Sequence, residues 1–75
     1  MNQLHQLSPR EKEVLILIAQ EKTTKEISKI LHISMETARS HRKSLMQKLE
    51  ARNVVGMVVR SLKIGLLTVQ HPMPG

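Results

Sequence analysis

The stretch SMETARSHRKSLMQKL, residues 34–49, has the pattern of one helix with two unlike faces. On a period of 3.6 residues per turn, Ala38, Leu45 and Leu49 fall on one line, which can pack against a core. Ser34 is a suitable N-cap, because its hydroxyl can accept a hydrogen bond from the free amides of the first turn. The opposite face carries charge and hydrogen-bonding groups: Glu36, Arg39, Ser40, Lys43, Ser44 and Gln47.

Two shorter helices are predicted ahead of this stretch. Ser8-Pro9-Arg10-Glu11 has the form of a capping box with proline at the first helical position, and the apolar residues of 14–18 predict that this helix is scaffold. Thr23 and Glu26 have the spacing of a second capping box, which opens a helix through Leu31. We expect this helix to turn three apolar side chains inward: Ile27, Ile30 and Leu31.

Residues 32–34, His-Ile-Ser, end one helix and cap the next. Two helices joined by so tight a turn form a helix-turn-helix if the second is exposed and basic. Ser28 is small at the expected helix crossing, and Ile33 is an apolar plug for the turn. Helical hairpins of this kind also occur in proteins that bind no DNA.

A fourth helix is predicted from its N-cap, Asn53, to about Lys63, with Gly65 placed to end it. Its apolar residues surround almost the whole helix, and one face, through Met57, Ser61 and Ile64, can pack inward. The remaining stripe would be costly to expose, so we expect a second copy of the chain to cover it. Alternatively, the stripe packs on the first helix and the chain end. The predicted dimer interface consists of Val55, Val58, Val59 and Leu62.

Composition limits the class of protein. Seventy-five residues make one small domain, and the absence of Phe, Trp and Tyr leaves a core of aliphatic side chains and methionine. The absence of cysteine excludes disulfides and thiolate ligands, which suits the cytoplasm. No apolar run approaches the roughly 20 residues of a membrane span. We therefore expect a cytoplasmic protein that does not enter a membrane.

The net charge of +6 is distributed unevenly. Residues 1–36 carry five basic and five acidic side chains, whereas residues 37–75 carry seven basic side chains and one acidic. This asymmetry indicates a polyanionic partner, although a solvated charged face would give the same count.

The residues give no indication of an enzyme active site or a metal site. The four histidines have no partner at helical spacing and no cysteine beside them, so we expect no metal site. The chain has no glycine-rich phosphate loop and no nucleophile elbow. We predict no catalytic group, no cofactor and no small-molecule ligand.

Five segments together carry a family likeness: LSPREKEVL (7–15), TTKEIS (23–28), HISMETARSH (32–41), MQKLEARN (46–53) and GLL (65–67). They occur in order and without a gap over about 60 residues, and they resemble the DNA-binding domain of LuxR/NarL/GerE-type bacterial transcription regulators. The resemblance implies an all-α, four-helix domain with a central helix-turn-helix. In this family the third helix enters the major groove and the fourth commonly mediates dimerisation. The family often has glycine where this chain has Glu50, so the end of the third helix is expected to close differently or to continue.

The resemblance assigns two groups of side chains. Arg39, Ser40 and Lys43 match positions that face base edges or nearby phosphates, and Arg39 can pair with guanine O6 and N7. The positions that usually touch the DNA backbone are Thr24, Lys25 and Thr37. Glu36 either accepts from a cytosine amino group or, as we favour, stabilises the helix dipole. Because they share the polar face of the same helix, the predicted DNA-binding set also includes Glu36, Ser44 and Gln47.

We therefore predict a sequence-specific regulator of transcription, or the output domain of a response regulator, that binds double-stranded DNA as a homodimer on inverted half-sites. The alternative is a helical protein-interaction module with a solvated basic face. RNA binding is disfavoured because no aromatic side chain is present for base stacking. The predicted organisation is a flexible arm or linker over 1–7, the domain over 8–67 and a disordered tail over 68–75. Most family members carry a receiver or ligand-binding domain ahead of this one, whereas the spore-regulator branch consists of stand-alone domains, and both possibilities stay open.

Overall fold

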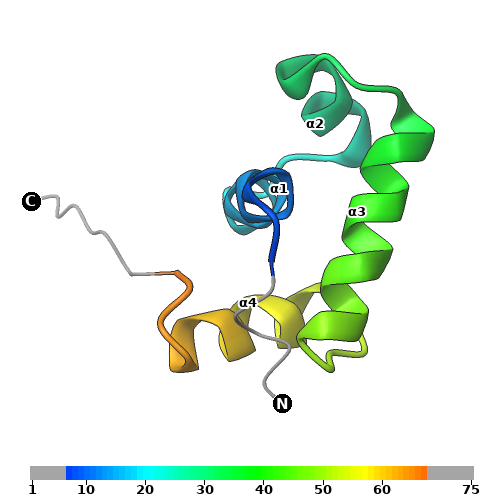
Figure 1. Ribbon diagram of the computed structural model, residues 1–75. Coiled ribbons are helices and arrows are strands. Elements are labelled where there is room, and N and C mark those ends of the chain that lie inside the picture. Colours follow the sequence, from blue (N-terminus) through cyan, green and yellow to red (C-terminus); the bar gives the residue numbers. More distant parts are fainter. Residues whose placement is uncertain (1–6, 68–75) are drawn as a thin grey trace, which may run out of the picture.

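The computed structural model describes residues 7–67, which form four helices and no strand. The helices are α1 (Pro9–Ala19), α2 (Thr24–Leu31), α3 (Met35–Lys48) and α4 (Val54–Lys63). Figure 1 shows α3 along one side of the molecule, with α2 at its first end, α4 at its second end, and α1 in the angle between them. The prediction of an all-α, four-helix domain is confirmed. The predicted disordered tail and residues 1–6 of the predicted arm lie outside the described residues.

The capping boxes form as predicted and set where α1 and α2 begin. The Glu11 amide donates to Ser8 Oγ at 3.0 Å, and the Ser8 amide donates to the Glu11 carboxylate at 2.9 Å. In α2 the Glu26 amide donates to Thr23 Oγ1 at 3.1 Å, while the Thr23 amide donates to the Glu26 carboxylate at 2.8 Å. Each box satisfies amides that would otherwise have no partner in the helix.

The other two helices begin at the predicted N-caps. The Thr37 amide donates to Ser34 Oγ at 3.0 Å, and the Gly56 amide donates to Asn53 Oδ1 at 2.8 Å. Glu50 follows α3 in the left-handed conformation, with φ of 54°. The helix therefore ends where a glycine would end it, with a side chain that is strained in that conformation.

The core is aliphatic and is shared by all four helices. Its central side chains come from the predicted faces of the helices, and α3 lies against both α1 and α2. Leu66 and Leu67 follow α4 and pack against the core. The buried hydrophobic residues are Leu7, Val14, Leu15, Ile18, Ile27, Ala38, Leu45, Leu49 and Met57.

Three side chains differ from the sequence-based predictions. Ile30 is 48% exposed, because the buried pair Ile27 and Ser28 orients α2 so that Ile30 lies around its side. Ile64 is 38% exposed, since it is the C-cap of α4 and no longer follows the buried face of Met57 and Ser61. Leu7, which the sequence analysis placed in the arm, is only 7% exposed and packs in the core.

Candidate nucleic-acid interface

Residues 23–48 form a helix-turn-helix. His32 ends α2 in the left-handed conformation, with φ of 57°, and the Ile33 amide returns to the Ser28 carbonyl at 2.9 Å. Ser28 itself is buried and donates its hydroxyl to the Lys25 carbonyl at 2.7 Å. Its polar group is thus satisfied within α2, and its small size lets α2 pack closely, as predicted.

The outer face of α3 is open to solvent. Ser40 is exposed along this face, and within residues 7–67 the long side chains of Arg39, Lys43 and Gln47 make no hydrogen bond or ion pair with the rest of the protein. Their polar groups are therefore free to meet a ligand. Glu36 is also exposed, in the first turn of α3, where its charge complements the positive end of the helix dipole.

The predicted backbone-contact residues lie around the two helix starts. Lys25 is exposed and Thr24 half-buried, both in the first turn of α2. Thr37 is exposed and accepts a hydrogen bond from the Ser34 hydroxyl at 2.9 Å, which leaves its own hydroxyl proton available. Arg42 Nη1 donates to Thr24 Oγ1 at 2.9 Å and so joins α3 to the start of α2.

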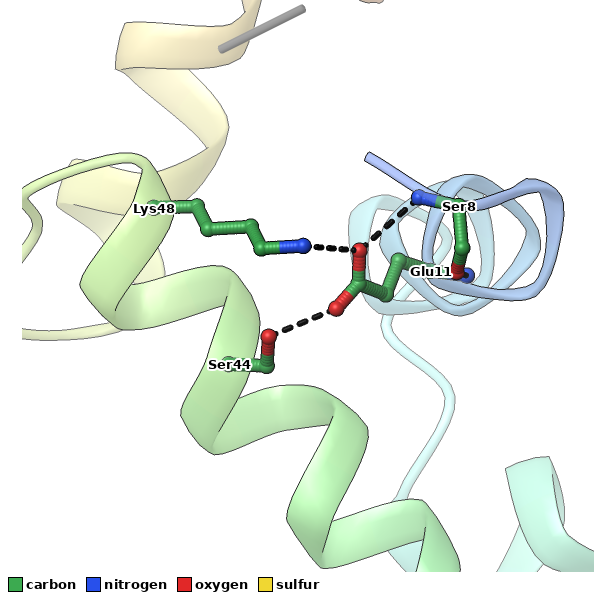
Figure 2. Close-up of polar contacts among 4 residues, drawn as sticks. All are labelled: Ser8, Glu11, Ser44 and Lys48. Atoms are coloured by element: carbon green, nitrogen blue, oxygen red, sulfur yellow. Dashed lines mark hydrogen bonds and ion pairs between the residues drawn. The ribbon is translucent and has the colours of Figure 1, made fainter. Parts of the chain in front are cut away.

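Ser44 differs from the other predicted contact residues. It is half-buried, and its hydroxyl donates to Glu11 Oε2 on α1 at 2.6 Å (Figure 2). The structure thus gives this hydroxyl a partner inside the domain, because Ser44 lies on the flank of α3 that faces α1. Lys48, one turn further on, brings Nζ to 2.9 Å from Glu11 Oε1, so part of the positive charge near the end of α3 is neutralised internally.

Glu11 is the centre of this cluster, and its side chain is only 8% exposed. Burial raises its pKa, but the hydrogen bonds from Ser44, Lys48 and the Ser8 amide, with the charge of Lys48, outweigh burial and lower the pKa to about 2. The carboxylate is therefore ionised throughout the neutral range. Sequence reasoning found only the capping role of Glu11. The one available signal of a further contact was the four-residue spacing of Ser44 and Lys48, which places both side chains on the same side of a helix.

The predicted dimer stripe lies mostly on the surface of α4. Val55 is 72% exposed, Val59 44% and Leu62 38%, whereas Val58 is half-buried and packs against the core of its own chain. Three of the four predicted interface residues thus form an uncovered apolar stripe, and Val58 contributes mainly to the interior.

Two further absences hold for the described part of the chain. Residues 7–67 bring no three His, Asp or Glu side chains together as a metal site. None of the helices in this range is long and apolar enough to cross a membrane.

A four-helix domain with an open basic face on the second helix of its helix-turn-helix has the architecture of a DNA-binding domain. Comparison with known proteins agrees: residues 5–61 match the luxR family of bacterial regulatory proteins. The solved structure of the transcription factor GerE superposes with a TM-score of 0.77 and 34% sequence identity, over 83% of this chain and 92% of that one.

Individual relatives are regulators. The spore germination protein GerE of Bacillus subtilis (strain 168) is 46% identical over 61 residues, which are 81% of this chain and 82% of GerE. The response regulatory protein YgeK of Escherichia coli (strain K12) is 38% identical over 65 residues, but the chain spans only 44% of YgeK. The transcriptional regulatory protein DesR of Bacillus subtilis (strain 168) is 42% identical over 59 residues, and the chain spans 30% of it.

The chain therefore belongs to the luxR family and is a DNA-binding transcription-regulator domain. The predicted family and class of function are confirmed. This family is one of regulators and not of enzymes.

Proposed function

We propose that α3 enters the major groove of double-stranded DNA and reads its sequence. The observation that carries this proposal is the outer face of α3, where Arg39, Lys43 and Gln47 are exposed and have no partner within residues 7–67. Charged side chains without partners on one face of a helix can reach base edges without first breaking internal hydrogen bonds.

The reading side chains have distinct chemistry. The Arg39 guanidinium can donate two hydrogen bonds to guanine O6 and N7, a contact that discriminates by about 1–3 kcal/mol. Lys43, one turn along α3, reaches a neighbouring guanine or a phosphate. Ser40 lets the helix approach closely, and Gln47 continues the same face at its far end. Glu36 stabilises the start of the helix.

Phosphate contacts set the register of the domain on DNA. The start of α2 supplies Lys25 and Thr24, and the start of α3 supplies Thr37, whose hydroxyl proton is available for a phosphate oxygen. Helix starts favour anions, because their amides and the helix dipole both point toward the ligand. These contacts are independent of sequence and weaken as salt increases.

Two copies of the domain pair through α4 on inverted half-sites. The exposed apolar stripe, defined by Val55, Val59 and Leu62, supports this pairing, since water contact with a continuous apolar surface is unfavourable. A symmetric pair would place the two α3 helices about 34 Å apart or a multiple of that distance. The protein acts in the cytoplasm, catalyses no reaction and needs no cofactor for this function.

The testing experiment is selection of duplexes from a random pool, followed by titration of the selected duplex and a scrambled one at several salt concentrations. We expect a palindromic selected sequence, bound far more tightly than the scramble, with log affinity falling linearly in log salt. Arg39→Ala with Lys43→Ala should remove most of the preference. Equal, weak binding to both duplexes would overturn the proposal and favour a protein-interaction module with a solvated basic face.

A further inference from the structure

Apolar packing alone does not select one rotation of α3 about its own axis. Ala38, Leu45 and Leu49 are fully buried and their close packing resists large rotations, but apolar contact is non-directional and Ala38 is small. A rotation of about 20° moves a side-chain tip about 6 Å from the helix axis by about 2 Å. That displacement is several times the range of about 0.5 Å over which an N–H···O hydrogen bond stays good. Directional polar bonds that limit the remaining rotation would therefore favour base reading by α3.

Two polar ties are placed to do this. At 100° per residue, Ser44 and Lys48 lie about 60–100° to one side of Leu45, and Arg42 lies about 60° to the other side. Ser44 and Lys48 bind the Glu11 carboxylate of α1 at 2.6 and 2.9 Å. Arg42 binds Thr24 of α2 at 2.9 Å. Rotation in either direction stretches one of the two ties.

Figure 2 shows how the first tie is built: the carboxylate of Glu11 points from the start of α1 toward α3, and Ser44 and Lys48 reach it from successive turns. The Ser8 amide donates at 2.9 Å to the same oxygen that Lys48 binds, so the capping box orients this acceptor by contacts within α1 alone. Charge-assisted hydrogen bonds at a nearly buried carboxylate are stronger and more directional than those at the surface. Within residues 7–67, the side-chain hydrogen bonds of Glu11 go to Ser8, Ser44 and Lys48 and not to the outer face of α3 or the start of α2.

We propose that Glu11 is a positioning residue for DNA reading: its bonds to Ser44 and Lys48, opposed by the Thr24–Arg42 bond, set the rotation of α3 and thereby the discrimination between sequences. This proposal rests on the proposed function of α3. It assigns to a buried side chain of α1 an effect on specificity that is separate from its effect on stability.

The test uses Glu11→Gln, with Glu13→Gln as the matched control. Both changes remove one negative charge from α1, but Glu13 is exposed, and within residues 7–67 its one ion pair is with Arg10 at 3.1 Å. Dissociation constants are measured for the selected duplex and the scrambled duplex, at a temperature where circular dichroism shows each variant fully folded. Discrimination is the dissociation constant for the scrambled duplex divided by that for the selected duplex. We expect Glu11→Gln to lower this ratio about 10-fold, while the dissociation constant for the scrambled duplex changes about twofold or less. Glu13→Gln should leave the ratio unchanged.

A double-variant cycle separates positioning from stability. If Glu11 acts through the reading side chains, Glu11→Gln should lower discrimination less in an Arg39→Ala background than in the parent. The Arg39 contact that a rotation of α3 would displace is already absent in that background. A purely structural effect would be additive with Arg39→Ala. Should Glu11→Gln prove too unstable, Ser44→Ala tests the same tie with Glu11 and Lys48 still paired, and a smaller loss of discrimination is expected.

The outcomes keep the two proposals apart. If Arg39→Ala leaves discrimination unchanged, α3 does not read bases as proposed. If Arg39→Ala lowers discrimination but folded Glu11→Gln and Ser44→Ala both retain the full ratio, the proposed function stands and the positioning role of Glu11 is wrong.

Discussion

At the scale of single residues, two glutamates depart from what their sequence positions suggest. Glu11 is both a capping residue and the acceptor that joins α1 to α3, and its pKa is lowered to about 2 in spite of burial. Glu50 occupies a left-handed position after α3, and its exposed carboxylate pairs with Arg60 at 3.2 Å. One of these glutamates stabilises the fold and the other strains it, and each gives a test.

The first prediction concerns acid stability. Glu11 has a pKa near 4.5 when unfolded and about 2 when folded, so its stabilisation is complete above the unfolded pKa and is lost as pH falls from about 5 to 2. The difference corresponds to about 3 kcal/mol. Urea unfolding of the parent and Glu11→Gln across this range should show the parent losing its advantage as pH falls. A constant gap between the two curves from pH 6 to pH 2 would contradict the assignment.

The second prediction concerns Glu50. Replacement by glycine removes the left-handed strain, which costs about 1 kcal/mol, at the expense of one exposed ion pair worth less than that. Glu50→Gly should therefore raise the free energy of unfolding by roughly 0.5–1 kcal/mol, measured by urea titration at pH 7. Glu50→Ala is the control: it keeps the strain, loses the ion pair and should not stabilise. Equal effects of the two variants would show that backbone strain is not the cause.

At the scale of elements, α4 is the helix whose own sequence supports it least. Gly56 stands in its first turn and donates its amide to the Asn53 side chain, while Gly65 follows the helix with φ of +84°. A glycine inside a helix weakens it, whereas a glycine with positive φ is the residue that the backbone prefers there. Gly56 therefore weakens α4, whereas Gly65 stabilises the way in which α4 ends.

The third prediction follows from that contrast. A Cβ at Gly56 would lie 3.4 Å from Asn53 Oδ1 and 3.7 Å from Ala51 Cβ, which is ordinary contact, so Gly56→Ala should stabilise the domain by up to about 1 kcal/mol. Gly65→Ala meets no atom within 4 Å but takes on a strained backbone, and it should destabilise by about 1 kcal/mol. Thermal unfolding of both variants checks the signs. Two shifts in the same direction would refute the conformational argument.

At the scale of the whole molecule, the two ends of α3 lie next to different surfaces, those of α2 and of the apolar stripe of α4. Figure 1 places α2 at one end of α3 and α4 at the other, so α2 and the apolar stripe of α4 are separated by the length of α3. The proposed pairing through α4 is therefore compatible with the proposed contact of α2 and α3 with DNA.

The fourth prediction tests that pairing. Val59→Asp places a charge in the stripe and should lower affinity for a duplex with two inverted half-sites by tenfold or more, while binding to one half-site changes little. The control is Ile16→Asp, which puts the same charge on an exposed apolar position of α1. Gel-shift titration and analytical ultracentrifugation provide the two measurements. Unchanged two-site binding by Val59→Asp would remove the stripe from the dimer interface.

The sequence by itself determined the local structure of this protein. The capping residues Ser8, Thr23, Ser34 and Asn53 begin the helices where the sequence predicted, because a cap depends on atoms within three residues of one another. The apolar line of α3 was also predictable, since its period follows from helix geometry. The exposed placement of Arg39 and Lys43 follows from the same period.

Only the tertiary structure decided what depends on the direction in which a helix faces its neighbours. Ile30 is exposed, Val58 is half-buried and Ser44 turns to α1, although each lies at a position where a helical period alone allows either outcome. The bond between Glu11 and Ser44 joins residues 33 apart in the chain, and no local pattern specifies which side chains such packing brings together. The period of α3 thus determines which of its side chains are exposed, and its packing against α1 and α2 determines which neighbours its flanks meet.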